Sequence, residues 1–201
     1  MTDDVRMPRA DARRNIAAIL DAAVAGLAED PDASLGDIAR AAGVGRVTLY
    51  GHFKSRAELL DAVLTRTMAE ADEVLDGVDT TGEPGAALAR LVEASWQIVH
   101  RFRAVLRAAG RELPPERLHG SHDRVRRRIQ SVVERGRRAG AFRTDLPAKW
   151  LTTTAISLMH AAAEDCAAGR LSARDAPRYI TATVLAALTP PGGPAPSRSG
   201  S

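Results

Sequence analysis

Hydrogen-bond donors recur in one short stretch near the start of the chain, Ser34 to Leu60. The polar side chains predicted to point outward from it are Arg46, Thr48, Tyr50, His52 and Lys54. Leu49 and Phe53 lie between them, at the four-residue spacing that places two side chains on one face of a helix. Side chains of these outward types donate to phosphate oxygens and to base edges. The stretch therefore predicts recognition of nucleic acid.

The pattern of the stretch is that of two short helices joined by a tight turn. Ser34 is a suitable N-cap for the first helix, and Asp37 follows three residues later, at the capping-box position. Gly43 comes where a left-handed residue closes a helix, and residues 46–53 then form the second helix. This arrangement predicts a helix-turn-helix whose second helix lies in a DNA major groove.

Two longer helices are predicted to flank this pair. The first runs from about residue 11 to 28 and packs across the helix-turn-helix, because two short helices cannot bury a core alone. The second runs from about residue 55 to 75. Its apolar residues are expected to leave this domain and enter a second core; they are Leu59, Leu60, Val63, Leu64 and Met68.

In this order and spacing, the motifs resemble the DNA-binding domain of the tetracycline-repressor (TetR) family. They are residues 34–39 (SLGDIA), 42–44 (AGV), 48–53 (TLYGHF) and 56–60 (RAELL). The resemblance covers about 45 residues and implies an all-α fold. A three-helix DNA-binding domain would precede a C-terminal helical-bundle domain for ligand binding and dimerisation. It further implies a homodimeric regulator, more often a repressor, that binds a palindromic operator in double-stranded DNA and is released by a small-molecule effector.

The resemblance and the outward positions together give a set of expected DNA contacts. They are Ser34, Gly45, Arg46, Val47, Thr48, Tyr50, His52, Lys54 and Arg56. In the family, the tyrosine at position 50 meets phosphate, and the position of Arg56 usually holds a phosphate-binding lysine. Residues 45–48 are placed to read base edges, although Arg46 could equally clamp a phosphate. Ser34 could cap its helix only, or also meet a phosphate.

Two glycines depart from the family pattern. Gly45 stands where the family often has serine, and Gly51 lies inside an exposed helix, where glycine costs about 1 kcal/mol relative to alanine. With these two departures, the resemblance does not predict which operator sequence the chain binds.

The whole chain is predicted to divide into four parts. A flexible N-terminal arm covers residues 1–10, the DNA-binding domain 11–56, the effector-binding and dimerisation domain 57–189, and a disordered tail 190–201. Helices are expected at about 85–110, at about 121–139, after Pro147 and at about 173–188, with a loop at Pro114–Pro115. The last two long helices are rich in Ala and Thr, which allow the close approach of a helical-bundle dimer interface.

A ligand pocket would lie among the middle helices. Its candidate residues combine apolar walls with a few polar groups: Trp96, Val99, His100, Arg103, His122, Arg126, Trp150, Met159 and His160. Taken singly, each could instead be a core or structural residue. His119, His122 and Asp123 could suggest a metal, but their spacing is poor for zinc and no Cys accompanies them. We therefore predict no metal and no cofactor.

Arginine is concentrated in the middle of the chain. Residues 101–143 hold thirteen Arg and four acidic residues, a local balance of +9. This region could be a second polyanion surface or an anionic effector site, or it could be a solvated helix face.

The composition of the chain and the motifs it lacks disfavour several other classes of protein. The chain lacks strand-rich runs, and its single cysteine, Cys166, excludes an intramolecular disulfide. Without a signal peptide or an apolar run of about 20 residues, a cytoplasmic protein is predicted. An enzyme is disfavoured because no nucleophile elbow, phosphate-binding loop or dinucleotide glycine pattern is present. The alternative that the chain is a helical protein that binds DNA or a partner without an effector is left open by the sequence.

Overall fold

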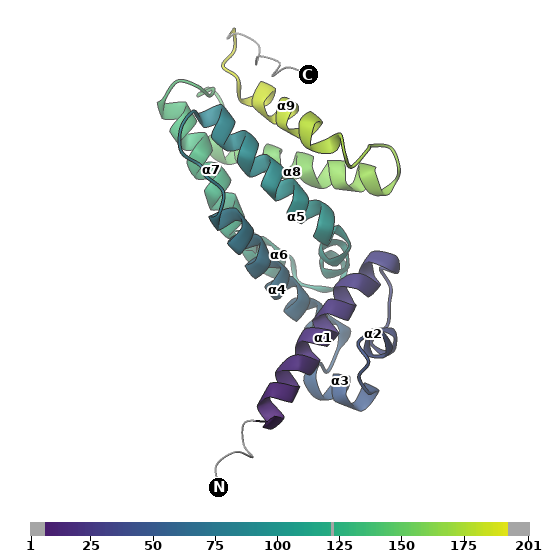
Figure 1. Ribbon diagram of the computed structural model, residues 1–201. Helices are drawn as coiled ribbons and strands as arrows, with labels where there is room; N and C mark the ends of the chain where they lie inside the picture. Colours follow the sequence, from purple (N-terminus) through teal and green to yellow (C-terminus); the bar gives the residue numbers. More distant parts are fainter. Residues whose placement is uncertain (1–6, 122, 193–201) are drawn as a thin grey trace. The chain divides into compact units, whose positions relative to one another are not determined.

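The computed structural model describes residues 7–121 and 123–192, with the side chains of 11–118 and 123–192. The regular structure of these residues is entirely α-helical (Figure 1). The helices are α1 (Met7–Glu29), α2 (Leu35–Ala41), α3 (Arg46–His52), α4 (Arg56–Asp76), α5 (Pro84–Glu112), α6 (Pro115–Ser121), α7 (Asp123–Arg138), α8 (Ala148–Ala167) and α9 (Ala176–Leu188). The predicted all-α fold is confirmed.

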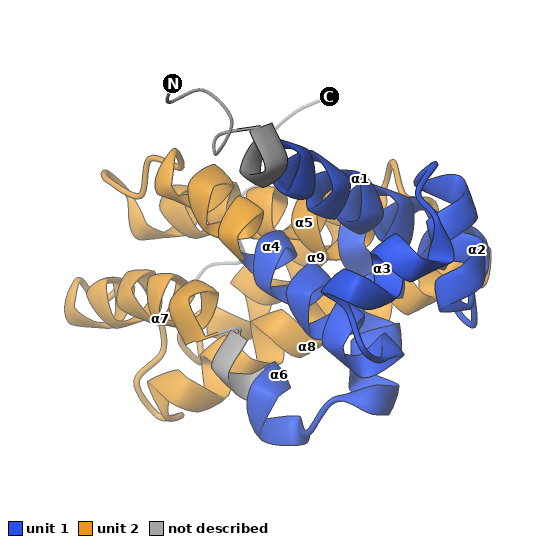
Figure 2. Cartoon of the chain, turned by 90° about the horizontal axis from the view of Figure 1, so that it is seen from below, with its two compact units in different colours: residues 1–68, 102–121 blue, residues 69–101, 122–201 orange. Residues whose placement is uncertain are grey.

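The chain forms two compact units, each assembled from two separate segments (Figure 2). Unit 1 comprises residues 1–68 and 102–121, and unit 2 comprises residues 69–101 and 122–201. Helices α4 and α5 therefore each contribute to both units. The units are defined by packing, so the functional boundary between residues 56 and 57 stays a prediction.

Unit 1 contains the predicted helix-turn-helix. Helix α1 packs on α2, and α2 packs on α3 (Figure 1). Leu49 and Phe53 join the side chains of α1 in one buried cluster, as predicted. That cluster also holds Ile19, Leu20, Ala23, Leu27, Leu35, Ile38, Ala39, Leu59, Leu60, Val63, Ala104, Val105 and Ala108. The C-terminal half of α5 thus belongs to the core on which the helix-turn-helix is built.

The expected destination of the α4 side chains was wrong. Leu59, Leu60 and Val63 pack in the core of the helix-turn-helix. Leu64 and Met68 pack around Ala109 of α5, also in unit 1. The reason is that the chain returns through α5 and covers this part of α4, a long-range pairing that helical periodicity does not reveal. Farther along α4, Leu75 enters the core of unit 2.

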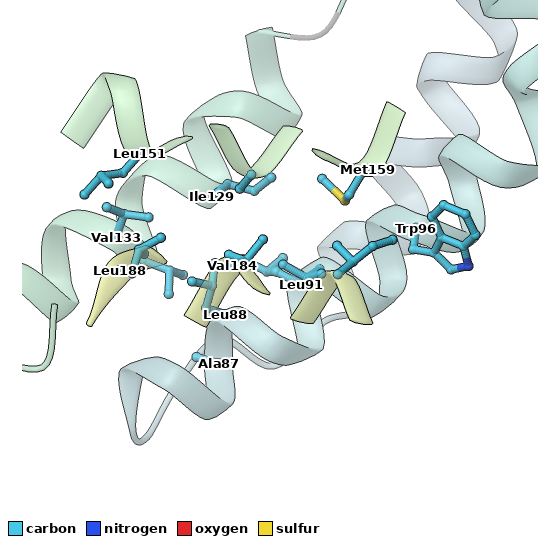
Figure 3. Packing of buried hydrophobic residues seen from close by; sticks show 14 of the residues in the cluster. Ala87, Leu88, Leu91, Trp96, Ile129, Val133, Leu151, Met159, Val184 and Leu188 are labelled. Atoms are coloured by element: carbon cyan, nitrogen blue, oxygen red, sulfur yellow. The ribbon is translucent and has the colours of Figure 1, made fainter. Parts of the chain in front are cut away.

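The core of unit 2 lies among α5, α7, α8 and α9. Helix α8 packs against both α7 and α9. In Figure 3, Trp96 lies at one end of the core side chains, and Val133, Leu151 and Leu188 lie toward the other. Met159 lies between α5 and α7 side chains in the same cluster.

Three local elements differ from expectation. Helix α1 begins at Met7, inside the range predicted as an arm, because Pro8 is tolerated in a first helical turn, where its missing N–H is not needed. Residues 1–6 lie outside the described residues. The predicted loop after Pro114 is instead the short helix α6, which starts at Pro115 for the same reason. The tail was predicted from residue 190, and residues 193–201 lie outside the described part.

None of the described helices combines the length and the apolar character needed to span a bilayer.

Candidate nucleic-acid interface

Helix α2 begins with the predicted capping box. The Ser34 hydroxyl donates to Oδ2 of Asp37 at 2.6 Å and accepts from the Asp37 N–H at 3.2 Å. The hydroxyl and the backbone N–H of Ser34 both donate to Oδ2 of Asp37, and these two hydrogen bonds, with smaller contributions from Arg40 and Arg46, hold the pKa of the Asp37 carboxyl below its ordinary value. After the helix, Gly43 has φ of 68°, the left-handed conformation predicted for it. The start and the end of α2 are therefore set by local hydrogen bonding.

Helix α3 presents a clear outward side. Leu49 and the C-cap Phe53 are buried, and each residue of an α-helix turns by about 100°. Val47 and Gly51 therefore point farthest from the core, with Thr48 and Tyr50 on either side of them. The exposed fraction of Val47 is 88%, and that of Tyr50 is 48%. A helix that is packed on the core along one face and exposed along the opposite face can enter a DNA groove.

The residues that close α3 are held by local contacts. The Lys54 ammonium donates to the carbonyls of Tyr50 and Gly51, at 3.0 and 3.4 Å. It thereby covers two of the open carbonyls at the helix C-terminus. His52 is half-buried, and its ring is tilted by 56° against that of Phe53. Both side chains stay predicted DNA contacts.

Arg56 is engaged within unit 1. Its guanidinium donates to the carbonyls of Pro31 and Ala33, at 2.7 and 3.1 Å, and forms an ion pair with Glu112. This side chain ties the start of α4 to the loop before α2 and to the end of α5. Its phosphate contact stays a prediction, and the structural role was not predicted because these partners are distant in the sequence.

The arginine-rich region is largely bonded to the protein itself. Arg124 and Arg128 of α7 pair with Asp72 of α4, at 3.2 and 3.0 Å. Arg137 donates to the carbonyls of Arg143, Thr144 and Leu146 in the loop before α8. Much of the +9 balance therefore holds helices and loops together within the units, a role outside the three considered from the sequence.

The predicted ligand residues are only partly brought together. Trp96 and Met159 share the core of unit 2, and the His100 ring stacks on Trp96 with centroids 5.2 Å apart. Half-buried Val99 packs against the same core. These four residues form one neighbourhood on α5 and α8.

The other candidates are distributed differently. Arg126 donates to the Thr153 hydroxyl at 3.1 Å, which links α7 to α8, and His160 is half-buried on α8. Trp150 lies in the first turn of α8 with an exposed fraction of 60%, more typical of a surface than of a pocket wall. Arg103 belongs to unit 1. His122 lies outside the described residues.

Two residues of interest were missed in the sequence. Ser95 is 3% exposed, and its hydroxyl has no hydrogen-bond partner within the described part of the chain. Gly36 lies directly beneath the Arg46 side chain. A serine on the apolar face of α5 was a usable signal for the first. Nothing local could have indicated the second, because its partner lies on another helix.

Comparison with known proteins gives a consistent result. The profile of "Bacterial regulatory proteins, tetR family" matches residues 19–63, which include the capping box and all of α3. The HTH-type transcriptional repressor LfrR of Mycolicibacterium smegmatis is 45% identical over 78 residues, 38% of this chain. That match spans 41% of the length of the LfrR chain.

Solved structures extend the similarity beyond the first unit. The structure of LfrR from Mycobacterium smegmatis in complex with proflavine has a TM-score of 0.70 and 29% identity, covering 88% of this chain and 97% of LfrR. A TetR family regulator from Marinobacter aquaeolei VT8 has a TM-score of 0.69 over 90% of this chain and 98% of its own, at 19% identity, and supports the fold alone.

The capped α2, the turn at Gly43 and the anchored α3 thus agree with a matching family profile, a related repressor and a shared fold. Residues 19–63 match the TetR family of bacterial regulatory proteins, and the chain is similar over 88% of its length to the TetR-like regulator LfrR.

Proposed function

We propose that this chain is a ligand-responsive DNA-binding transcriptional regulator, and specifically a repressor. The observation that carries the proposal is the outward side of α3, where Val47 is 88% exposed on a helix whose opposite face is buried. An exposed apolar side chain beside Thr48 and Tyr50 suits a major groove, where methyl groups and acceptors are both read. The function is binding rather than catalysis, and it places the protein in the cytoplasm with the DNA.

The DNA-binding part is tested by selection of double-stranded DNA from a random pool, followed by footprinting. We expect a palindrome whose half-sites are about 34–36 Å apart or a multiple of that distance. Val47→Ala should change the preference among selected sequences, since position 47 faces the bases. Val74→Ala, at another exposed valine, is the matched control and should change nothing. Failure to enrich any palindrome would contradict the proposal.

The proposed homodimer uses α8 and α9. These helices expose two large side chains, Trp150 (60%) and Tyr179 (46%), together with the small residues Ala182, Thr183 and Ala186 on α9. Exposed aromatic residues among small ones are common where helices associate. We expect Ala186→Glu to yield a monomer by light scattering and to weaken operator binding. Ala139→Glu, at an exposed position outside these helices, should leave the dimer intact. A dimer that survives Ala186→Glu would count against this interface.

The proposed effector binds near Ser95 and Trp96 in unit 2. A buried hydroxyl without a partner costs about 1–3 kcal/mol, and a polar group on a ligand could satisfy it. Trp96 follows Ser95 in the chain, the His100 ring stacks on it, and Met159 lies in the same core, so aromatic and polarisable side chains are present in this part of unit 2. The related repressor LfrR was solved with proflavine, and we propose that this chain also responds to a planar aromatic cation.

Proflavine should raise the melting temperature and release the operator in a mobility-shift assay, because a ligand stabilises the state it binds. Ser95→Ala should leave the free protein as stable as before, or more stable, and reduce the shift in melting temperature. Ser131→Ala, at an exposed serine of α7, is the control. If the chain binds DNA but proflavine changes neither its melting temperature nor its operator affinity, the function is DNA binding without this class of effector.

A further inference from the structure

Gly36, the second residue of α2, lies against the side chain of Arg46 on α3. A methyl group placed on the Gly36 Cα would be 2.9 Å from Nη2 of Arg46 and 3.2 Å from both its Cζ and its Nε. Three atoms of one planar group at nearly equal distances mean that the guanidinium lies flat over the glycine. Any larger residue at position 36 would push it away, and only the side chain would have to move.

Charge favours the same placement of Arg46. The next residue, Asp37, is anchored by the Ser34 capping box and pairs with Arg40. Arg46 also interacts electrostatically with this carboxylate. The Arg46 guanidinium makes no hydrogen bond or ion pair of its own within the described part of the chain. It is thus drawn toward α2 while its donors stay available.

The position of Arg46 along α3 separates it from the outward residues. Arg46 lies next to the buried side defined by Leu49 and Phe53, whereas Val47 and Gly51 point away from the core. Its long side chain then runs to α2 instead of folding over Val47. In a helix-turn-helix the first helix crosses the DNA backbone, and the second enters the groove. A guanidinium held on the first helix is therefore held at the phosphates.

We propose that Gly36 is a positioning residue that seats the Arg46 guanidinium on α2, so that Arg46 binds a backbone phosphate and does not read a base. This assignment rests on the proposed DNA-binding function. It leaves base reading to Val47 and Thr48, and it resolves the two roles that the sequence left open for Arg46. Seating the side chain in advance removes part of the entropy lost on binding.

The test uses the full chain and a fluorescent duplex enriched by that chain, with dissociation constants measured at several salt concentrations. Gly36→Ala should weaken binding about 3- to 10-fold on every duplex. In an Arg46→Ala background, the same change should have no further effect, as expected when one residue acts through the other. Gly26→Ala is the matched control, since a methyl group there meets no atom within 4 Å.

Arg46→Ala supplies a second readout that does not depend on the alanine at position 36. If Arg46 binds phosphate, the slope of log Kd against log salt should fall by about 1, and the ranking of single-base variants of the duplex should not change. Additive losses for the two substitutions would overturn the positioning role, and a changed preference at one base pair would assign Arg46 to that base. A parental chain that binds no duplex would refute the proposed function itself, which separates the two failures.

Discussion

Helices α3 and α7 both carry arginine and one internal glycine. On α3, the Arg46 guanidinium rests on Gly36 without bonding to any other described residue, and a methyl group at Gly51 would meet no atom within 4 Å. On α7, Arg128 and Arg137 bond to carboxylates and carbonyls, and Gly136 lies directly under the Phe142 ring. Arginine and glycine therefore lie at an exposed surface on α3, whereas on α7 they make internal contacts.

This difference shows how a basic region can be interpreted. Arginine is far denser around α7 than around α3, and density alone would favour α7 as the polyanion surface. What separates the two regions is whether each guanidinium already has partners in the folded chain. A guanidinium that binds several carbonyls has its donors occupied, whereas an unbonded one can exchange water for phosphate.

The largest expected effect comes from the glycine of α7. An alanine at position 136 would overlap the Phe142 ring, and the buried ring has little room to move. Gly136→Ala should therefore lower the free energy of unfolding by about 3 kcal/mol, measured by urea denaturation. Combining it with Phe142→Leu should recover part of the loss. An unchanged midpoint would show that this packing is loose.

The second effect concerns an arginine of α7. Arg137→Met keeps most of the apolar stem but removes the donors that serve Arg143, Thr144 and Leu146. We expect a loss of about 2 kcal/mol in unfolding free energy. Arg127→Met, on an exposed side chain of the same helix, should cost much less. Equal losses for both would mean that the carbonyl contacts contribute little to stability.

The third prediction has the opposite sign. Gly51→Ala adds a methyl group to open space inside α3 and should raise the unfolding free energy by about 1 kcal/mol, because alanine restricts the unfolded chain and favours the helix. Gly51→Ala and Gly136→Ala make the same chemical change on α3 and on α7, so the changes in their unfolding free energies can be compared directly. A destabilised Gly51→Ala chain would indicate an unseen contact at α3.

The smallest effect should depend on pH. Hydrogen bonds from the Arg143 guanidinium, at 2.7 and 2.8 Å, lower the pKa of the Asp145 carboxyl in the folded chain below its ordinary 3.8. The resulting stabilisation is complete above the unfolded pKa and is lost as the pH falls through the folded value. Asp145→Asn should thus be less stable than the parent at pH 7, and the urea midpoints should converge in strong acid. A constant difference at every pH would argue against this ion pair.

Predictions from the sequence succeeded where the controlling interactions are local. The capping box of Ser34 and Asp37, the left-handed Gly43 and the burial of Leu49 and Phe53 all involve residues a few positions apart. They failed where the chain returns on itself. Leu64 and Met68 were assigned to the wrong core because their partner, Ala109, lies on the distant end of α5.

The candidate site divides in the same way. The sequence by itself determined the helix-turn-helix and its caps, since capping acts within one or two turns. The outermost positions of α3 are Val47 and Gly51, which differ from the outward row predicted from the sequence, and His52 of that row is half-buried. Only the tertiary structure decided what the arginines do. Arg56 meets carbonyls 23 and 25 residues away, Arg128 meets a carboxylate 56 residues away, and Arg46 rests on a glycine of another helix. A guanidinium reaches far from its own backbone, so its partners depend on how distant segments pack.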